Sequence, residues 1–406
     1  MRLAALDPAA RHSRAAVDRA LAAHLCRCTG WNTIVEAVLS YGNSRPAAMP
    51  DDKMAVRRAT LEGRAAQVVG PAVSLGRGGF ADDTAPTDAL VAVRSDAGDW
   101  VVGETLAEAR RRAGKVPGRR STAPLTWPVT VPDGAWARTL QTTWVEPAYL
   151  EPDASWCAPG GEPVTALANG GAFGGKVDSE VGEVARRLAA NHRRAVRVVY
   201  AREDVVRLGP KRPPLAAGVR ADGTGVVRVV RTPEVAERLA AIAPGLRVEE
   251  VDVHGPRTSV ALRGAVWAEA AVLLSSLGAG PDTVVAPNGA TATASIDADG
   301  GFHVRVRCGE PLDEVVLRSY CTGAAHMGLG WVRSEGLAVD AAGVPVDLTI
   351  RSFGILRSSE TPPVTVEVVP DDGEPVNGSD AVMAAVAAAA WRHAGFPSRW
   401  PVGCAP

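Results

Sequence analysis

The chain has 406 residues, of which 46% are hydrophobic and 22% are charged, and its formal net charge is −1. These values fit a globular protein with two or three domains, and they give no reason to expect binding to nucleic acid or to an anionic membrane surface. The longest apolar run, Ala381–Trp391, is too short to cross a bilayer. The cysteines form no disulfide framework and no secretory signal is evident, so we expect a reducing, cytoplasmic environment.

The N-terminal part of the sequence predicts a small helical unit over residues 1–41. Apolar residues recur near helical spacing in Ala15–Leu25, with Ser13 as the N-cap, and again in Thr33–Leu39. Residues 42–66 are predicted to be a linker, because they open with a stretch rich in Gly, Asn, Ser and Pro.

After the linker, short β-prone runs alternate with helices, which predicts an α+β fold. A first α/β unit is expected over residues 67–140 and a longer mixed α/β region over residues 141–406. The predicted strands are Leu90–Val93, Trp100–Val102, Ala292–Ile296, Phe302–Val306, Val344–Ile350 and Val364–Val369. The predicted helices are Leu106–Ala113, Ser179–Asn191, Ala324–Val332 and Ala381–His393.

The first chemical motif is HLCRCTGW at His24–Trp31, in which Cys26 and Cys28 precede a Thr-Gly-aromatic turn. Two thiolates at a helix end, beside a tight turn, suit an iron–sulfur cluster. The alternative is a pair of buried, inert thiols. The other cysteines are scattered singly, so this chain supplies at most half of a four-ligand site. They are Cys157, Cys308, Cys321 and Cys404.

The second motif is the glycine-rich loop NGGAFGGK at Asn169–Lys176, which precedes a predicted helix. Such a loop exposes backbone N–H groups and a helix N-terminus, which together hold phosphate or another anion. The loop also matches most of the P-loop pattern, but Val177 stands where a magnesium-binding Ser or Thr is required. A further alternative is a turn whose glycines let helix and sheet pack closely.

Three separated motifs resemble the xanthine dehydrogenase and aldehyde oxidase family of molybdenum hydroxylases, in the family's own order. CRCTGW resembles the second half of the family's second [2Fe–2S] site, the segment Leu75–Val93 resembles the start of its hammerhead domain, and NGGAFGGK resembles its GGGFGGK loop. The resemblance implies a helical [2Fe–2S]-type domain over residues 1–41, a hammerhead-like unit over 67–140 and a molybdopterin-binding-like region over 141–406.

The resemblance also implies site residues for two cofactors. Cys26 and Cys28 would ligate half of a [2Fe–2S] cluster, which a Cys-x-x-Cys pair from a neighbouring polypeptide or a longer N-terminus would complete. The positions implied to contact molybdopterin are Gly170, Gly171, Phe173, Gly174 and Gly175.

The catalytic base of the family has no direct counterpart in this sequence. In the family, a glutamate in a Gly-x-Gly-Glu turn near the C-terminus deprotonates the metal-bound water, and Ser379 stands at the corresponding position here. A serine with an ordinary pKa is a very poor proton acceptor near neutral pH. Asp380, one residue further on, is the candidate that would replace it.

Two functions follow from the resemblance. In the first, the chain is an oxidoreductase component that passes electrons from a molybdopterin site through [2Fe–2S] to an iron–sulfur or flavin subunit. In the second, it is a non-catalytic scaffold or assembly partner that has lost the molybdenum cofactor. CRCTGW favours the first function, whereas Ser379 and a shortened cofactor region favour the second. We expect the isolated chain to hold little or no cluster and to hydroxylate neither purines nor aldehydes.

Overall fold

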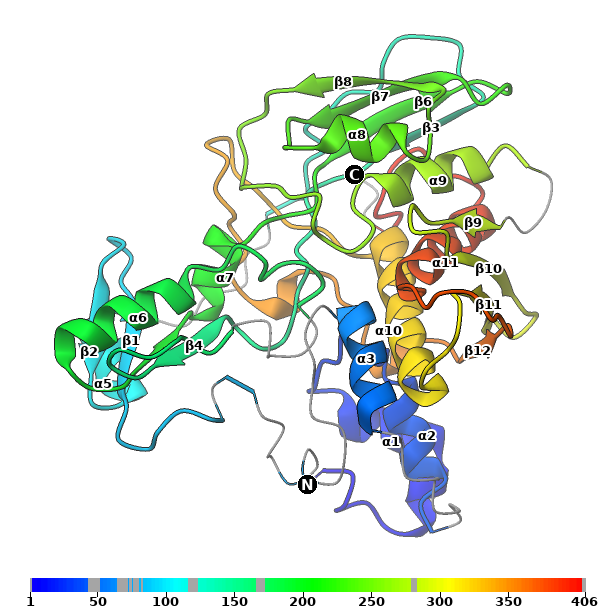
Figure 1. The fold of residues 1–406 in the computed structure, drawn as a ribbon. Coiled ribbons are helices and arrows are strands. Elements are labelled where there is room, and N and C mark those ends of the chain that lie inside the picture. The colour runs from blue at the N-terminus through cyan, green and yellow to red at the C-terminus, as the bar shows by residue number, and fades with distance from the viewer. Residues whose placement is uncertain are drawn as a thin grey trace.

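The chain forms three four-stranded mixed sheets with helices packed against them, which confirms the predicted α+β class (Figure 1). This architecture is that of a computed structural model, and none of the helices in its described part combines the length and apolar character needed to cross a bilayer. The described residues are 2–42, 52–63, 72, 75, 80–81, 83–115, 123–165, 172–278 and 283–403.

One sheet and its helices stand apart from the rest of the molecule, on the left of Figure 1. The strand order is β2-β1-β5-β4, with β1 and β5 parallel and both outer pairs antiparallel. Ala92, Val196 and Val198 form the core of this lobe together with α6. The elements of the lobe are β1 (Leu90–Arg94), β2 (Trp100–Gly103), α5 (Leu106–Arg112), β4 (Ala154–Cys157), α6 (Val181–His192), β5 (Val196–Val199) and α7 (Arg202–Leu208).

This sheet corrects the predicted boundary at residue 140. Strands β1 and β2 lie in the unit predicted over residues 67–140, whereas β4 and β5 come from the region predicted over 141–406. Strand β3 (Arg138–Gln141), at the end of the predicted unit, pairs instead with β6 (Leu215–Val219). The sequence did not indicate this arrangement, because the parallel pairing of β1 with β5 joins strands that are distant in sequence.

The other two sheets share one pattern, in which two antiparallel pairs are followed by one parallel pair. Their strand orders are β3-β6-β7-β8 and β9-β10-β11-β12. Helices α8 and α9 pack on the first of these sheets, and α10 and α11 pack on the second. The remaining elements are β7 (Gly225–Val230), α8 (Val235–Ala240), β8 (Leu246–Val251), α9 (Trp267–Ser275), β9 (Val284–Val285), β10 (Thr291–Ile296), β11 (Phe302–Arg307), α10 (Glu314–Arg333), β12 (Val364–Val368) and α11 (Ser379–His393).

Helices α10 and α11 form the centre of the largest hydrophobic core. Helix α10 is longer than the predicted Ala324–Val332, because Asp313 caps it by accepting a hydrogen bond from Val316 N at 2.9 Å. The two helices approach closely at Gly328, where a Cβ atom would lie 2.3 Å from the Met383 carbonyl oxygen. This contact sets the start of α11 against α10.

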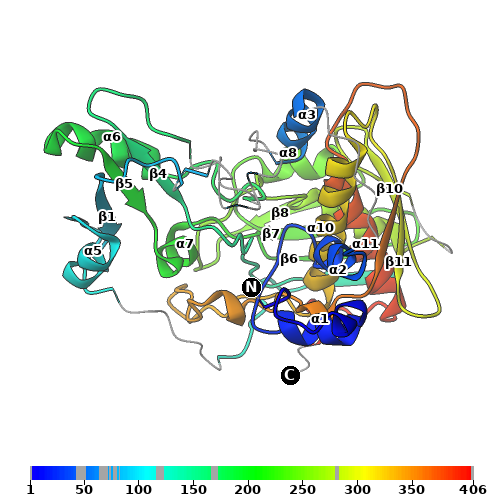
Figure 2. The same cartoon turned by 90° about the horizontal axis from the view of Figure 1, so that it is seen from below.

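The N-terminal helices pack around a hydrophobic cluster of their own. Val17, Trp31 and Val35 are buried in this cluster. Figure 2 shows α1 and α2 on the lower face of the molecule, beside α10. The N-terminal helices are η1 (Ala9–His12), α1 (Arg14–Leu21) and α2 (Asn32–Leu39).

Two sequence predictions of irregular or extended structure are corrected. The predicted linker, residues 42–66, contains the helix α3 (Asp52–Gly63), which packs against α10. The predicted strand Val344–Ile350 is absent from the described residues, which have at this place only an isolated bridge between Val339 and Pro345. A proline lacks the N–H that a strand ladder requires. Two short 3-10 helices follow, η3 (Ile350–Ser352) and η4 (Ser358–Glu360).

Candidate functional site

The CRC motif lies between α1 and α2 and is seated on α10. Gly323 of α10 makes this contact possible, since a Cβ atom there would lie 1.9 Å from the Cys28 carbonyl oxygen. Gly30 turns the chain with a φ of +53°, and its Cα lies close to His326. The Thr-Gly-aromatic pattern therefore forms the tight turn that the sequence predicted.

The two thiols of the motif lie in different surroundings. Cys26 is buried in the N-terminal cluster, and its Sγ is 3.0 Å from the Thr29 hydroxyl oxygen. Cys28 is exposed, yet desolvation of its thiol and, second to it, the neighbouring Cys26 thiol raise its pKa to about 11. Arg27, Arg263 and Lys176 act in the opposite direction on that pKa without outweighing the desolvation. The two thiols thus differ in their exposure and in their hydrogen-bond partners.

The described residues do not fit a [2Fe–2S] cluster. Such a cluster needs four ligands, and no group of three or more His, Cys, Asp or Glu side chains in the described ranges could hold a metal ion. Cys157, Cys308 and Cys321 are buried as free thiols, and Cys404 lies outside the described residues.

Arg27, between the two cysteines, enters the protein core. Its guanidinium forms a two-pronged ion pair with Glu335, with Nη2 2.7 Å from Oε2, and both side chains are 2% exposed. Its Nε also donates to the Pro147 carbonyl oxygen at 3.3 Å. The pair joins residues 308 positions apart. Because no local pattern signals such a distant pairing, sequence reasoning missed both residues.

His326 packs against Gly30 of the CRC motif, so its titration tests whether this part of the protein is buried. Its Nε2 is 3.2 Å from the Leu356 carbonyl oxygen, and burial, with a smaller contribution from Arg27, lowers its pKa to about 3. The unfolded chain, with a histidine pKa of about 6.5, therefore takes up the proton first as the pH falls. Stability is lost from about pH 6.5 downward, by up to about 2 kcal/mol between pH 7 and pH 5.

His326→Gln keeps a hydrogen-bond donor but does not titrate in this range. We expect its free energy of unfolding, measured in urea, to fall less than that of the wild type between pH 7 and pH 5. Parallel losses in the two proteins would contradict the buried, neutral state of His326.

The glycine-rich loop leads into α6 as predicted, but its described glycines are packed against protein. Gly170 and Gly171 lie outside the described residues. Gly174 has a φ of +85°, and a Cβ atom there would lie 1.9 Å from the Ala261 carbonyl oxygen. A Cβ atom built on Gly175 would lie 2.6 Å from the Tyr149 ring, which is also too close. These two glycines serve close packing, which is the alternative that the sequence left open.

Phe173 lines a cavity, and that cavity is small. The Arg263 guanidinium lies 5.0 Å from the centre of the Phe173 ring. Arg27, Met327 and Glu335 also border the cavity, whose volume is about 30 Å³. Such a volume holds one or two water molecules, whereas small-molecule and cofactor pockets measure about 300–1,000 Å³. The described residues beside Phe173 therefore do not fit a pterin cofactor.

Lys176, at the end of the glycine-rich loop, is turned inward. Its Nζ lies 4.8 Å from the centre of the Tyr149 ring and has no hydrogen-bond partner among the described residues. Burial lowers the pKa of Lys176 to about 8. A P-loop lysine instead extends toward a bound phosphate. This placement adds to the mismatch at Val177 and argues against nucleotide binding.

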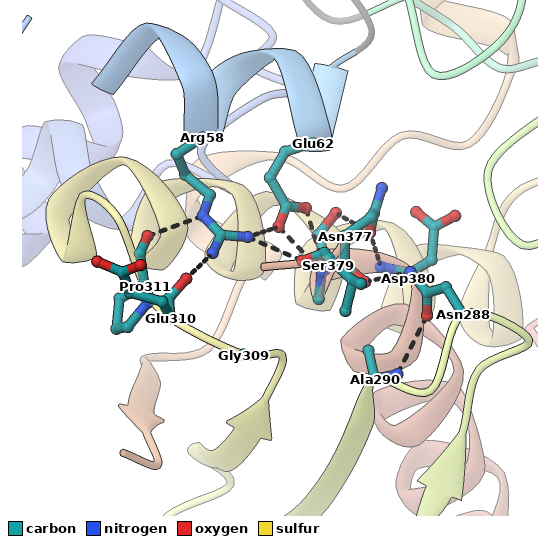
Figure 3. Close-up of polar contacts among 12 residues, drawn as sticks. Arg58, Glu62, Asn288, Ala290, Gly309, Glu310, Pro311, Asn377, Ser379 and Asp380 are labelled. Atoms are coloured by element: carbon teal, nitrogen blue, oxygen red, sulfur yellow. Dashed lines mark hydrogen bonds and ion pairs between the residues drawn. The ribbon is translucent and has the colours of Figure 1, made fainter. Parts of the chain in front are cut away.

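A carboxylate from α3 closes the start of α11 (Figure 3). Glu62 Oε1 accepts a hydrogen bond from Gly378 N at 2.9 Å, and Oε2 accepts one from Ser379 N at 3.1 Å. Arg58, one turn earlier on α3, donates to Glu62 Oε1 at 3.3 Å, and both side chains are 0% exposed. A helix N-terminus favours a negative charge, and here the chain itself supplies it.

Ser379, at the position of the family's base, and Asp380, the candidate that would replace it, are both bound by Arg263. Its Nη2 donates to Ser379 Oγ at 2.9 Å, and its Nε donates to Asp380 Oδ1 at 3.1 Å. Ser379 is 0% exposed, and the Asp380 side chain is 26% exposed. The side chains of Ser379 and Asp380 are thus both engaged by one buried arginine of this chain.

Glu62 is a site residue that sequence reasoning missed. Burial raises the pKa of Glu62, which is a property of many general bases. Both of its oxygens, however, accept hydrogen bonds from this chain, and no part of its side chain is exposed to a substrate. The available signal was the i, i+4 spacing of Arg58 and Glu62, which indicates a helical ion pair but not its burial.

Comparisons with known proteins identify the fold. A scan against protein-family models finds no match, and a search of curated proteins finds none either. Among solved structures, the aldehyde oxidoreductase from Desulfovibrio gigas matches with a TM-score of 0.63 at 12% identity, over 97% of this chain and 86% of that chain. The aldehyde oxidoreductase from Desulfovibrio desulfuricans matches with a TM-score of 0.59 at 10% identity, over 93% and 83%.

The chain has the aldehyde oxidoreductase fold. The reconstituted CO dehydrogenase from Oligotropha carboxidovorans also matches, with a TM-score of 0.55 at 9% identity, over 86% of this chain and 96% of that chain. These matches agree with the predicted resemblance to the xanthine dehydrogenase and aldehyde oxidase family. The aldehyde oxidoreductase fold does not by itself carry an activity, which has to be argued from the residues of the site.

Proposed function

We propose that the chain is a cofactor-free member of the aldehyde oxidoreductase fold that acts as a scaffold or assembly partner. The observation that carries this proposal is the closure of the start of α11 by Glu62 (Figure 3). The family resemblance puts the proton-accepting glutamate at this point. Here the helix N-terminus is bound by an internal carboxylate, and Ser379 and Asp380 are bound by Arg263.

The packing of the glycine-rich loop supports the same proposal. A loop that held molybdopterin would need open space beside Gly174, and that side of Gly174 lies against the backbone at Ala261. The cavity that Phe173 lines has room for water alone. Electron transfer through a cluster would need both thiols of the CRC motif as ligands, and Cys26 is buried whereas Cys28 is exposed.

An oxidoreductase component is the second candidate, and the fold is the observation that favours it. In that case a neighbouring polypeptide, such as an iron–sulfur subunit, or a longer N-terminus would supply the missing ligands. The two candidates differ in metal content and in turnover, so one experiment separates them.

The test is to produce the chain in a host that makes molybdopterin, and to measure molybdenum, iron and turnover on aldehydes and purines. We expect far less than one molybdenum and one iron per chain and no turnover, because Glu62 and Arg263 occupy the position of the family's base and the described residues offer no four-ligand cluster site. Stoichiometric molybdenum with turnover that is lost in Asp380→Ala would overturn the proposal and make Asp380 the base.

A further inference from the structure

A hollow of about 430 Å³ lies on the face of α10 that points away from the site described above. Met327 and Trp331 of α10 border the small cavity beside Phe173, whereas Leu329, Val332 and Arg333 border the hollow. An α-helix turns by about 100° per residue, so these two sets of side chains leave α10 on opposite sides. The hollow is therefore separate from the Glu62 site.

The floor of the hollow is apolar. Helices α10 and α11 both end here, beside the turn that joins β10 to β11. Phe302, Leu329, Val332 and Ala390 line it and are buried. Its volume falls in the range of about 300–1,000 Å³ that is typical of small-molecule pockets. Such a floor would bury an apolar group of a few carbon atoms or an aromatic ring.

The rim of the hollow carries two opposite charges that do not pair with each other. Arg333 and Glu360 both line the hollow and are exposed. Within the described residues, the Arg333 side chain has no hydrogen bond or ion pair. Glu360 Oε2 accepts a hydrogen bond from Arg357 N at 2.8 Å, which leaves its other oxygen available. The rim thus presents one cationic and one anionic group to any molecule on the floor.

A simpler role for Arg333 is to complement the dipole at the end of α10. The carbonyl groups at that end already have partners, however. Val332 O accepts a hydrogen bond from Val402 N at 2.8 Å, and Arg333 O accepts one from Gly403 N at 3.0 Å. The guanidinium is therefore not needed to satisfy them.

We propose that this hollow binds an α-amino acid with a large apolar side chain. Its carboxylate would pair with Arg333, its ammonium would pair with Glu360, and its side chain would lie on the floor at Phe302. An α-amino acid offers these three groups in one small molecule, and each has a matching partner in the hollow. This site is independent of the proposed scaffold function.

The binding test compares three probes by calorimetry at pH 7.5. They are phenylalanine, 2-phenylethylamine, which lacks the carboxylate, and 3-phenylpropanoate, which lacks the ammonium. We expect phenylalanine to bind saturably and each of the other two to bind at least about tenfold more weakly, because each loses one charge-assisted hydrogen bond.

Substitutions of the exposed rim residues test each contact separately and are not expected to unfold the protein. We expect Arg333→Gln to weaken phenylalanine binding about tenfold and to leave 2-phenylethylamine unaffected. Glu360→Gln should weaken phenylalanine and leave 3-phenylpropanoate unaffected. Ala394→Trp, at an exposed lining position, should fill the hollow and abolish binding. Arg238→Gln is the matched control, since Arg238 is an exposed arginine on α8 that does not line the hollow.

Three results would overturn the proposal. The first is no saturable binding of phenylalanine up to about 10 mM, which corresponds to a binding free energy weaker than about −3 kcal/mol. The second is equal binding of all three probes. The third is binding that survives both Arg333→Gln and Ala394→Trp, since the ligand would then sit elsewhere.

Discussion

Arg27→Met is expected to lower the free energy of unfolding by about 3–5 kcal/mol, because it leaves the Glu335 carboxylate buried without its partner. Both side chains of this pair are 2% exposed, so water cannot replace the lost guanidinium. Burial already raises the pKa of Glu335 even with Arg27 present. The loss measured in urea should therefore shrink as the pH is lowered from 7 to 5, where Glu335 in the variant is protonated.

Two comparisons show that burial causes the loss. Arg27→Met/Glu335→Leu removes both charges and should recover most of the stability, since an apolar replacement of a buried ion pair is often neutral. Arg305→Met breaks a two-pronged pair with Glu367 whose side chains are 60% and 56% exposed, and it should cost less than about 1 kcal/mol. Equal losses for Arg27→Met and Arg305→Met would show that the first pair is hydrated.

Gly174→Ala is expected to be more damaging than Gly175→Ala, the other single-methyl addition in the described part of the glycine-rich loop. The added Cβ would lie 1.9 Å from the Ala261 carbonyl oxygen, and the φ of +85° is itself unfavourable for alanine. The left-handed conformation costs about 1–2 kcal/mol, and overpacking adds about 1–3 kcal/mol. Urea unfolding monitored by tryptophan fluorescence measures the sum.

Gly289→Ala separates these two contributions. Gly289 has nearly the same φ, +86°, and nothing lies within 4 Å of a Cβ atom built on it. This control should show only the conformational cost of about 1–2 kcal/mol. If the two variants lost equal stability, the loop would not be packed against Ala261 and space for a ligand would have to be reconsidered.

The sequence predicted the elements whose signals are local. The strands at Leu90–Arg94 and Phe302–Arg307 and the helix at Ser379–His393 lie within a few residues of their predicted bounds, because β-branched runs and helical periodicity decide them. Predictions failed where distant partners decide. The pairing of β1 with β5 moved a domain boundary, and Pro345 removed a predicted strand.

In the candidate site, too, contacts between residues distant in sequence could not be predicted. The motif at Cys26–Trp31 predicted a tight turn, since the turn depends on Gly30 itself. For the loop at Phe173–Gly174 the sequence left cofactor contact and close packing open, because both need glycines. The groups that close the site could not be found in this way. Nothing in the order of residues near Glu62 indicates that its carboxylate binds Gly378, 316 positions away.

The contacts of the CRC motif also set the order in which this chain becomes protected during its synthesis. The charge of Arg27 has no ion-pair partner until Glu335, 308 residues later, has been synthesised. A ribosome adds about 5–20 residues per second, so this wait lasts roughly 15–60 s. During that time α1 and α2, at eight residues each, have little more than each other to pack against, and isolated helices of this length are marginal in water. The segment that contains α1 and α2 is therefore exposed to proteases and chaperones until residues about 300 positions later have been synthesised.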